Sequence, residues 1–278
     1  MLGRLSTVER TLLYAALGVG GLLAVIPLWY MVTVALQPKI FILEAPSSLW
    51  PRAITFDNFL KAWSENDFQR YFLNSLVVAI ATTVVSTALS AMAAYGFARY
   101  RFRGKEFVFG AVLVSLMVPA IMLIIPQFIV AKSLGLLNSL HGLVTVYVAM
   151  SIALNTFLLR GFFEELPREL EEAMFVDGGT PLTAFRHVVL PLAQPALATV
   201  AVFTFLFSWD EFTWALTSLN RQELRTLPIA IATFQSAHQT EWSLVFAASL
   251  IAVVPVILAF VFGQRFFIRG LSSSGLKG

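Results

Sequence analysis

Long apolar stretches alternate with shorter polar connections along the whole chain. Each of six stretches has about 20 or more mostly apolar residues, which is enough for a helix to cross about 30 Å of hydrocarbon. Because backbone groups in lipid must hydrogen-bond within their own segment, we expect these stretches to be helices. The predicted membrane-spanning helices cover residues 11–36, 71–98, 107–131, 133–159, 188–219 and 242–264.

The composition indicates the same class. Of the 278 residues, 58% are apolar and only 13% are charged, and the mean hydropathy is +0.79. A soluble chain of this size needs far more charged residues to cover its surface. We therefore expect an all-α membrane protein with six transmembrane helices in a single domain, residues 1–278. The first stretch is too long for the apolar core of a signal peptide, so we expect it to be retained.

The residue content excludes several chemistries. The chain has no cysteine, which excludes disulfides and thiolate metal sites, and its three histidines lie far apart without ligand spacing. The net charge of +3 comes without a basic block, so we expect no nucleic-acid partner. We expect no metal and no cofactor. Because the GxxxxGK[ST] phosphate loop is absent from the sequence, we do not expect the chain to bind or hydrolyse ATP.

The basic residues predict the orientation of the spans. Seven of them lie in the longer connections on one side of the predicted bundle. Twelve lie on the other side: Arg4, Arg10, Arg99, Arg101, Arg103, Lys105, Arg160, Arg168, Arg186, Arg265, Arg269 and Lys277. Since basic residues accumulate in cytoplasmic connections, we expect both termini and the connection 160–187 to be cytoplasmic.

The connection 160–187 carries signals for two short helices outside the bilayer. An acidic run at 169–172 suits the first turns of a helix, where negative charge is favoured by the dipole. Gly178 suits a left-handed helix end. Thr180 and Pro181 then match an N-cap and a first helical residue. The segment therefore predicts a compact cytoplasmic knob that a partner protein could bind.

Two further patterns concern packing. Small residues that repeat every four positions predict a close helix contact on the second span: Ser86, Ser90, Ala94 and Ala98. Prolines within the spans predict kinks, which suit either a bundle around a path or ordinary helix packing: Pro27, Pro119, Pro126 and Pro255.

In and just after the connection 160–187, the sequence resembles a known family. Glu172-Ala173-Met174, then Gly178, then Val188-x-Leu190-Pro191 is similar to the cytoplasmic "EAA" signature of ABC importer permease subunits. Met174 replaces the usual second alanine and Val188 the usual isoleucine, and both keep apolar character. Further stretches resemble the carbohydrate-uptake branch, of the maltose and glycerol-phosphate type: 71–75, 93–105, 117–128, 134–139, 208–212, 224–231 and 264–278.

The resemblance implies a type I importer permease fold with a cytoplasmic coupling helix, in a bacterial or archaeal inner membrane. It implies four kinds of partner: two ATPase subunits that carry ATP and Mg, a second homologous permease subunit, an extracytoplasmic binding protein and a sugar or oligosaccharide. The chain itself is then a non-catalytic subunit. Alternative solutes within the family are glycerol phosphate, polyamines and amino acids, and an alternative outside it is a secondary transporter.

The resemblance also implies roles for five residues of the knob. Glu172 matches the acidic anchor that pairs with a basic residue of the ATPase subunit. Ala173 and Met174 pack in the cleft of that subunit, Gly178 supplies the turn, and Asp177 caps backbone amides beside it. The alternative for Glu172 is a solvated residue that only interacts with the helix dipole.

A second candidate site interrupts the fifth span. Asp210 and Glu211 lie within its apolar run, between Trp209 and Trp214. Charges within spans are costly and usually face a cavity, and aromatic rings suit the apolar faces of sugars, so we hypothesise that this group lines the translocation path. The alternative is the outer membrane interface, where tryptophan is common. The same choice, between the path and interhelical hydrogen bonds, is open for three asparagines: Asn74, Asn138 and Asn155.

Two external connections are the candidates for docking the binding protein. The connection 37–70 predicts a short interfacial helix at 56–63. The connection 220–241 corresponds to a loop that reaches into the binding protein in the maltose-type family, although a solvated loop explains it equally. Its polar residues are Gln222, Arg225, Gln235, His238 and Gln239.

Overall fold

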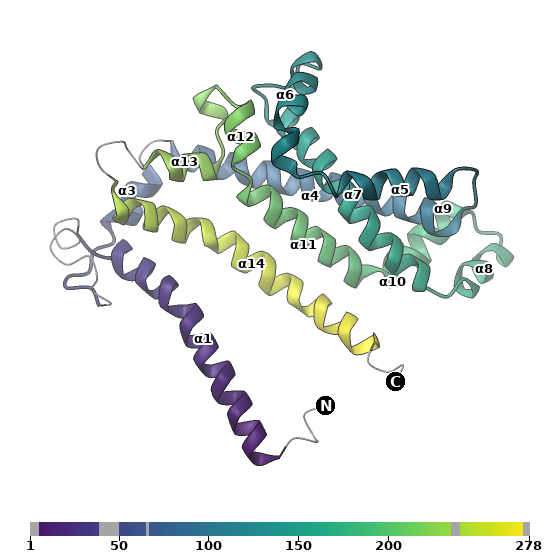
Figure 1. Ribbon diagram of the computed structural model, residues 1–278, viewed down its shortest axis with the longest axis horizontal. Coiled ribbons are helices and arrows are strands. Elements are labelled where there is room, and N and C mark those ends of the chain that lie inside the picture. The colour runs from purple at the N-terminus through teal and green to yellow at the C-terminus, as the bar shows by residue number, and fades with distance from the viewer. Residues whose placement is uncertain (1–5, 39–49, 65–66, 235–239, 275–278) are drawn as a thin grey trace. The chain divides into compact units, whose positions relative to one another are not determined.

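The computed structural model describes residues 6–38, 50–64, 67–234 and 240–274, and all the helical elements in Figure 1 fall in these ranges. The predictions that concern Arg4, Lys277, Gln235, His238 and Gln239 lie outside the described residues. The chain divides into two compact units. The first contains residues 1–69 and 230–253, and the second contains 70–229 and 254–278.

The first unit contains α1 (Thr7–Ala35) and α3 (Asp57–Ser64). α1 begins with a capping box, in which the Ser6 hydroxyl accepts from the Glu9 amide and the Glu9 carboxylate accepts from the Ser6 amide. At its other end, the Asn58 side chain of α3 donates to the carbonyls of Ala35 and Gln37, at 2.8 and 2.9 Å. α3 confirms the short helix predicted at 56–63.

The second unit contains most of the helices. In chain order they are α4 (Phe68–Arg99), α5 (Lys105–Ser115), η2 (Ala120–Leu123), α6 (Ile124–Ser133), α7 (Leu140–Glu165), α8 (Glu169–Val176), α9 (Pro181–Ala184), η3 (Phe185–Val189), α10 (Leu190–Leu192), α11 (Gln194–Asp210), α12 (Thr213–Ser218) and η4 (Gln222–Leu224). α7 packs against α5 and α11. Among the described elements, α4 begins two residues inside the first unit, and two further helices contribute to both units: α13 (Leu227–Thr233) and α14 (Trp242–Ser274).

Among the described residues, four helices are long and apolar enough to cross a membrane, and there are up to six such spans if two bent helix pairs each count as one. The four are α1, α4, α7 and α14, the last over Trp242–Gln264. These agree with the predictions for the first, second, fourth and sixth spans to within a few residues, except that α7 begins at Leu140 instead of 133. Ser139 caps α7 there by accepting from the Gly142 amide at 3.2 Å.

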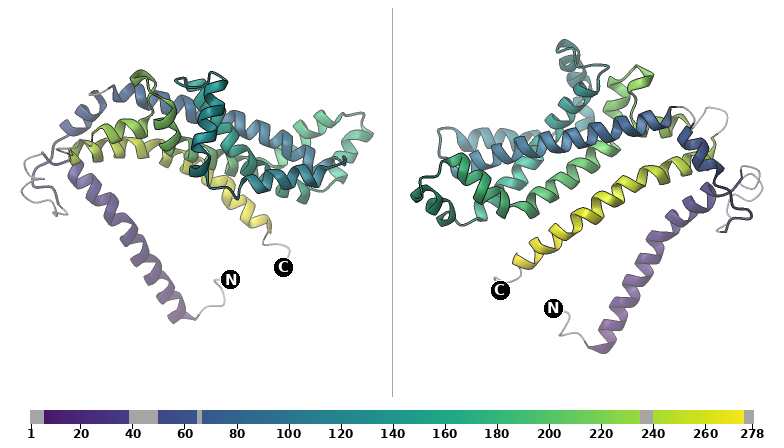
Figure 2. Two further views of the ribbon diagram at one scale, coloured as in Figure 1. Left: turned by 45° about the horizontal axis from the view of Figure 1, so that its top comes forward. Right: turned by 180° about the vertical axis from the view of Figure 1, so that it is seen from behind.

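The prediction of one helix over 107–131, kinked at its prolines, is wrong, because the chain forms separate helices there. α5 and the η2–α6 pair meet at 96°, and the change of direction is visible in Figures 1 and 2. The break falls at Pro119, whose backbone is extended at φ −58° and ψ 127°. Proline has no amide hydrogen for the helix and disfavours helical conformation in the residue before it.

The continuous helix predicted over 188–219 is also wrong. η3 is one turn of π-helix, and the helices on either side of Ala193 meet at 78°. α11 then ends at Asp210, because Glu211 is extended at φ −66° and ψ 118°. Hydrophobicity detects these two regions as apolar, but it does not register where a helix bends.

The stripe of small residues on α4 packs closely, as predicted. Ser86, Ser90 and Ala94 are fully buried and Ala98 is 3% exposed. Around the C-terminal half of this stripe, residues of α4, α7, η3 and α11 form a core cluster that includes Ala94, Phe163 and Val200. The end of α4 that we predict to be cytoplasmic therefore packs against α7, η3 and α11.

Candidate functional site

The helix of the predicted knob is α8, and its sequence explains both of its ends. The chain is extended at Leu166, and α8 then starts at Glu169 with three glutamates in its first turn. At its other end, Gly178 adopts φ +83°, a conformation that side chains disfavour. The amide of Gly179 donates to the Met174 carbonyl at 2.9 Å, and a β-carbon on Gly179 would lie 2.7 Å from that oxygen. Both glycines are therefore needed for this turn.

The second short helix starts as predicted. Thr180 caps it by accepting from the Thr183 amide at 3.3 Å, and Pro181 is its first residue. It does not end at His187, because the chain continues through the π-turn η3 into α10. Turns of π-helix are frequent at functional sites.

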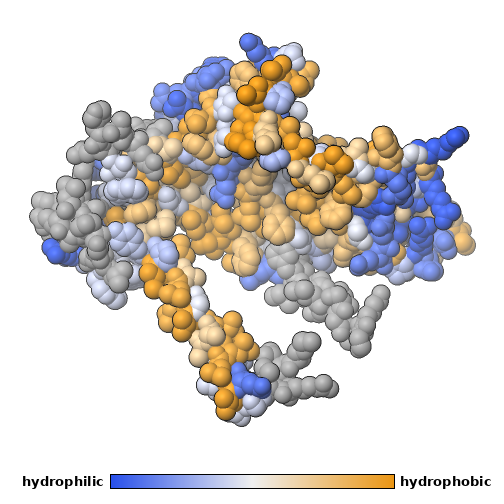
Figure 3. All heavy atoms as spheres, viewed as in Figure 1, coloured by the Kyte–Doolittle hydropathy of each residue, from blue (hydrophilic) through white to orange (hydrophobic). Residues whose placement is uncertain are grey.

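The five residues predicted to bind an ATPase subunit lie together on α8 and its turn. Glu172, Ala173, Asp177 and Gly178 are exposed, and Met174 is half-buried. In the part of the chain that the structure describes, no hydrogen bond or ion pair reaches the carboxylates of Glu172 and Asp177. The backbone cap predicted for Asp177 is thus not formed in this structure. In Figure 3 hydrophilic residues cover the end of the second unit where α8 lies, beyond the apolar surface of its helices.

The contacts of Glu171 were missed by sequence reasoning. Glu171 is only 5% exposed, although Glu172 beside it points outward. Its carboxylate accepts from the Arg99 guanidinium at 2.5 Å and from the Tyr95 hydroxyl at 2.9 Å, and both of these residues lie on α4. The four-residue spacing of Tyr95 and Arg99 was a signal for one face of a helix, but the sequence could not show which glutamate meets it.

The group at the end of α11 is brought together only in part. Trp209 is 2% exposed and stacks on Phe205, while Trp214 is 2% exposed within a core cluster that includes Tyr147. Asp210 is exposed. The path assignment stays a prediction, and of the four residues Asp210 is the one whose charge is open to solute in this structure.

Glu211 has a clear structural role at the same place. Its carboxylate accepts from the backbone amides of Trp214 and Ala215, at 2.7 and 3.0 Å, and from the Tyr147 hydroxyl at 2.5 Å. It therefore satisfies the free amides in the first turn of α12. This contact also joins α12 to α7.

The three asparagines all make internal hydrogen bonds. Asn155 donates to Ser86 on α4 at 3.0 Å and to Thr204 on α11 at 2.8 Å, so that it joins three helices. Asn74 donates to the carbonyls of residues 223 and 225, and the side chain of Asn138 accepts from the amide of residue 220 at 2.6 Å. These bonds favour the packing role over the path role.

The bonds of Asn74 and Asn138 fix the described part of the connection after α12, which is predicted to be external. Within it, the pKa of the exposed Glu223 carboxyl lies below its ordinary value, first because its own backbone amide donates to it and then because the Arg221 guanidinium does. Arg221 and Glu223 form an ion pair at 2.7 Å. The connection therefore presents a defined charged surface.

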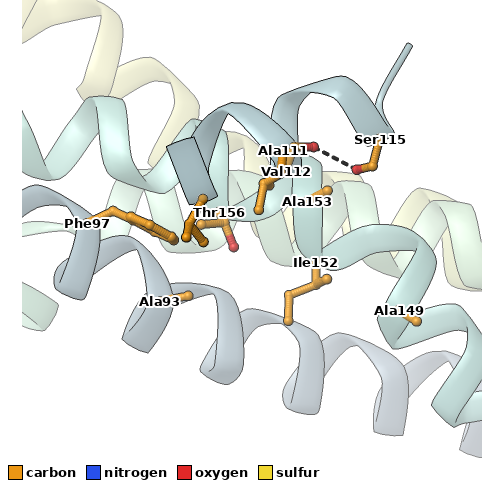
Figure 4. Close-up of a pocket in the computed structure, with 10 residues that line it drawn as sticks. Ala93, Phe97, Ala111, Val112, Ser115, Ala149, Ile152, Ala153 and Thr156 are labelled. Atoms are coloured by element: carbon orange, nitrogen blue, oxygen red, sulfur yellow. Dashed lines mark hydrogen bonds between the residues drawn. The ribbon is translucent and has the colours of Figure 1, made fainter. Parts of the chain in front are cut away.

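In the described chain, a cavity of about 570 Å³ lies between α4 and the first turns of α7. Two more lie along α7 beside α5 and α6. One of about 460 Å³ is bounded by α4, α5 and α7, and Figure 4 shows mostly alanine and other apolar side chains around it. The other, of about 730 Å³, lies at the break between α5 and α6 and is lined by Pro119, Gln127 and Phe207 among others. Both are too poor in polar groups to resemble a sugar site, which requires several convergent hydrogen-bonding groups. In the described chain there is no group of three or more possible metal ligands.

Comparisons with known proteins agree with this geometry. Residues 86–273 match the family described as "Binding-protein-dependent transport system inner membrane component". The chain is 35% identical over 252 residues to a probable ABC transporter permease protein of Bacillus subtilis, YurM, covering 91% of this chain and 83% of that one. It is 34% identical to the trehalose transport system permease protein SugB of Mycobacterium tuberculosis, covering 92% and 93%.

A solved structure shows the same fold. A chain from a bacterial ABC transporter involved in the import of the acidic polysaccharide alginate superposes with a TM-score of 0.83 at 23% identity. The superposition covers 95% of this chain and 99% of that one.

Proposed function

Because the chain belongs to the family of binding-protein-dependent transport system inner membrane components, we propose that it is the permease subunit of an ATP-driven importer in the cell membrane. The solute that we propose is a sugar or oligosaccharide, delivered by an extracytoplasmic binding protein. The trehalose system of the Mycobacterium relative and the alginate cargo of the structural neighbour support this class. The helices have the fold of a chain from a solved ABC transporter. This likeness supports a translocation path that the chain forms together with a second, homologous permease subunit.

The observation that carries the proposal is the outward-facing surface of α8. Glu172 is exposed and has no partner in the described chain, although its neighbour Glu171 is buried and paired. A short helix presented in this way suits a site on each of two ATPase subunits, with Glu172 facing a basic residue. Ala173 and Met174 would add apolar contact, and the turn at Asp177 and Gly178 would complete the surface.

In this arrangement the chain performs no chemistry. ATP and Mg bind to the ATPase subunits, and their closure moves α8, which then biases the helices between outward-facing and inward-facing states. Both termini and α8 are on the cytoplasmic side, and six spans cross the bilayer, with each bent helix pair as one span. Asp210 lines the path in this proposal, while Glu211 holds the start of α12 beside it.

The experiment tests partner binding and transport separately. The tagged chain is purified from membranes of its own host and examined for an ATPase subunit and a second permease. Glu172→Lys reverses the charge of the proposed contact, so we expect membrane insertion to be retained and copurification of the ATPase subunit and uptake to be lost. The matched control is Glu169→Lys, which makes the same change at an exposed residue of the same helix outside the signature. Equal copurification and uptake in Glu172→Lys and wild type would overturn the assignment.

A further inference from the structure

We propose that Glu171, Arg99 and Tyr95 form a rigid joint through which a displacement of α8 moves α4. This inference rests on the proposed function, because it requires an ATPase subunit to act on α8. It separates two neighbouring glutamates by role. Glu172 touches the partner, whereas Glu171 is a positioning residue that transmits the motion into the helices.

The geometry fixes α8 in more than one direction. Arg99 and Tyr95 are four residues apart on one face of α4, and each binds a different oxygen of the Glu171 carboxylate. Arg99 uses a second nitrogen to donate to the Leu166 carbonyl at 3.0 Å, just before α8. The Tyr95 hydroxyl also lies 3.5 Å from the Pro181 carbonyl, just after the turn of α8. The start, middle and end of the loop are thus attached to two side chains of one helix.

The joint is closed to solvent. The side chains of Arg99 and Glu171 are 8% and 7% exposed, and the Tyr95 ring packs on Phe185 of η3 with centroids 4.9 Å apart. A buried ion pair is often no more stabilising than an apolar contact of the same size, but its hydrogen bonds allow one relative geometry only. Stability alone is therefore a poor explanation for charges at this position.

From the joint, a continuous set of contacts runs into the helices. The next turns of α4 carry Ser90 and Ser86, and the Ser86 hydroxyl lies 2.7 Å from that of Ser151 on α7. Asn155 of α7 then bonds both Ser86 and Thr204 of α11. A rotation imposed on α4 at Glu171 therefore reaches α7 and α11 through hydrogen bonds and close packing.

The absence of cysteine from the sequence makes a direct measurement of the joint feasible. Spin labels are introduced at Met92→Cys on α4 and Val176→Cys on α8, which are 61% and 88% exposed. In the whole transporter we expect one narrow distance between the labels with and without ATP. With Glu171→Gln added, we expect a broad distance distribution, because one charge-assisted contact has been lost.

The functional readout is the amount of solute transported per ATP hydrolysed in reconstituted vesicles. For Glu171→Gln we expect this ratio to fall about fivefold or more, the lower range of coupling energies between sites. The ATPase subunits should still copurify, since Glu172 is intact. Glu169→Gln, at an exposed residue of the same helix, should leave both the ratio and the distances unchanged.

A second variant covers the case in which Glu171→Gln leaves Arg99 unpaired and the chain does not reach the membrane. Arg99→Met with Glu171→Met replaces the pair by apolar side chains, which proteins usually tolerate. We expect normal insertion, broad distances and the same loss of coupling. The proposed joint is wrong if a variant that reaches the membrane keeps both a narrow distribution of label distances and the wild-type amount of solute transported per ATP. Failure of the wild-type chain to copurify an ATPase subunit would instead overturn the proposed function.

Discussion

Adjacent residues of this chain differ sharply in environment, and Glu171 and Glu172 are the clearest case. Successive residues of a helix point about 100° apart, so one of the two reaches Arg99 and the other reaches water. The sequence predicted an acidic start to α8 and an anchor at Glu172. It could not predict the buried pair, because that depends on how α8 rests on α4.

Asp210 and Glu211 show the same difference and lead to opposite expectations. Glu211→Ala removes a carboxylate that accepts from two amides of α12 and from Tyr147, so we expect a loss of about 1–2 kcal/mol of stability. Thermal unfolding of the purified protein in detergent measures this loss.

Asp210→Asn changes an exposed group, so we expect a stability change within about 0.5 kcal/mol but slower uptake. An Asp210→Asn variant with unchanged uptake kinetics would remove Asp210 from the path.

At the scale of elements, the turn after α8 depends on backbone conformation. Gly178 has φ +83°, so Gly178→Ala forces a β-carbon into a left-handed conformation at a cost of about 1–2 kcal/mol. We expect the end of α8 to shift and the copurified ATPase activity to respond less to solute. Gly161→Ala is the matched control, because Gly161 lies inside α7 with open space at its β-carbon. Equal solute stimulation in the two variants would show that the turn geometry is unimportant for coupling.

The contact between α4, α7 and α11 leads to a third expectation. Asn155→Ala removes both side-chain hydrogen bonds that join the three helices, and such bonds contribute about 0.6 kcal/mol on average, with a maximum near 1.7. We expect a fall of that size in the free energy of unfolding, measured in detergent or bicelles. Leu158→Ala, at a residue 40% exposed on the same helix, is the comparison that should cost less. If the two cost the same, the polar contact adds nothing beyond apolar packing.

Elements were predictable where length and hydrophobicity decide them. α1 and α4 lie within a few residues of their predicted bounds, and α14 begins at its predicted first residue but continues past 264 to Ser274. The capped start of α9 follows directly from Thr180 and Pro181. A kink was predicted at Pro119 but not a full break, and the end of α11 at Asp210 was not predicted, because an apolar run reads the same whether its helix continues or stops. Pro119 carried the physical signal, but a proline within a membrane helix often produces only a kink.

At the scale of the whole molecule, the bent pair of α5 and α6 decides how many times the chain crosses the bilayer. The two helices meet at 96°, so they form either one broken span or a loop that enters and leaves on the same side. The positive-inside pattern favours the broken span, because the basic residues near 101–105 and the connection after α6 are then on opposite sides.

Single cysteines in this cysteine-free chain distinguish the two topologies. One thiol is placed at an exposed position before α5, in the last turn of α6, on α8 or after α12 by Arg103→Cys, Lys132→Cys, Val176→Cys or Asn220→Cys. With six spans, a membrane-impermeant maleimide should label positions 132 and 220 in right-side-out vesicles and positions 103 and 176 only in inverted ones. Labelling of position 132 only from the inverted side would make α5–α6 a re-entrant loop and change the orientation of every later helix. Labelling of position 176 from the outside would remove α8 from the reach of any cytoplasmic ATPase, and with it the coupling proposed for Glu171 and Glu172.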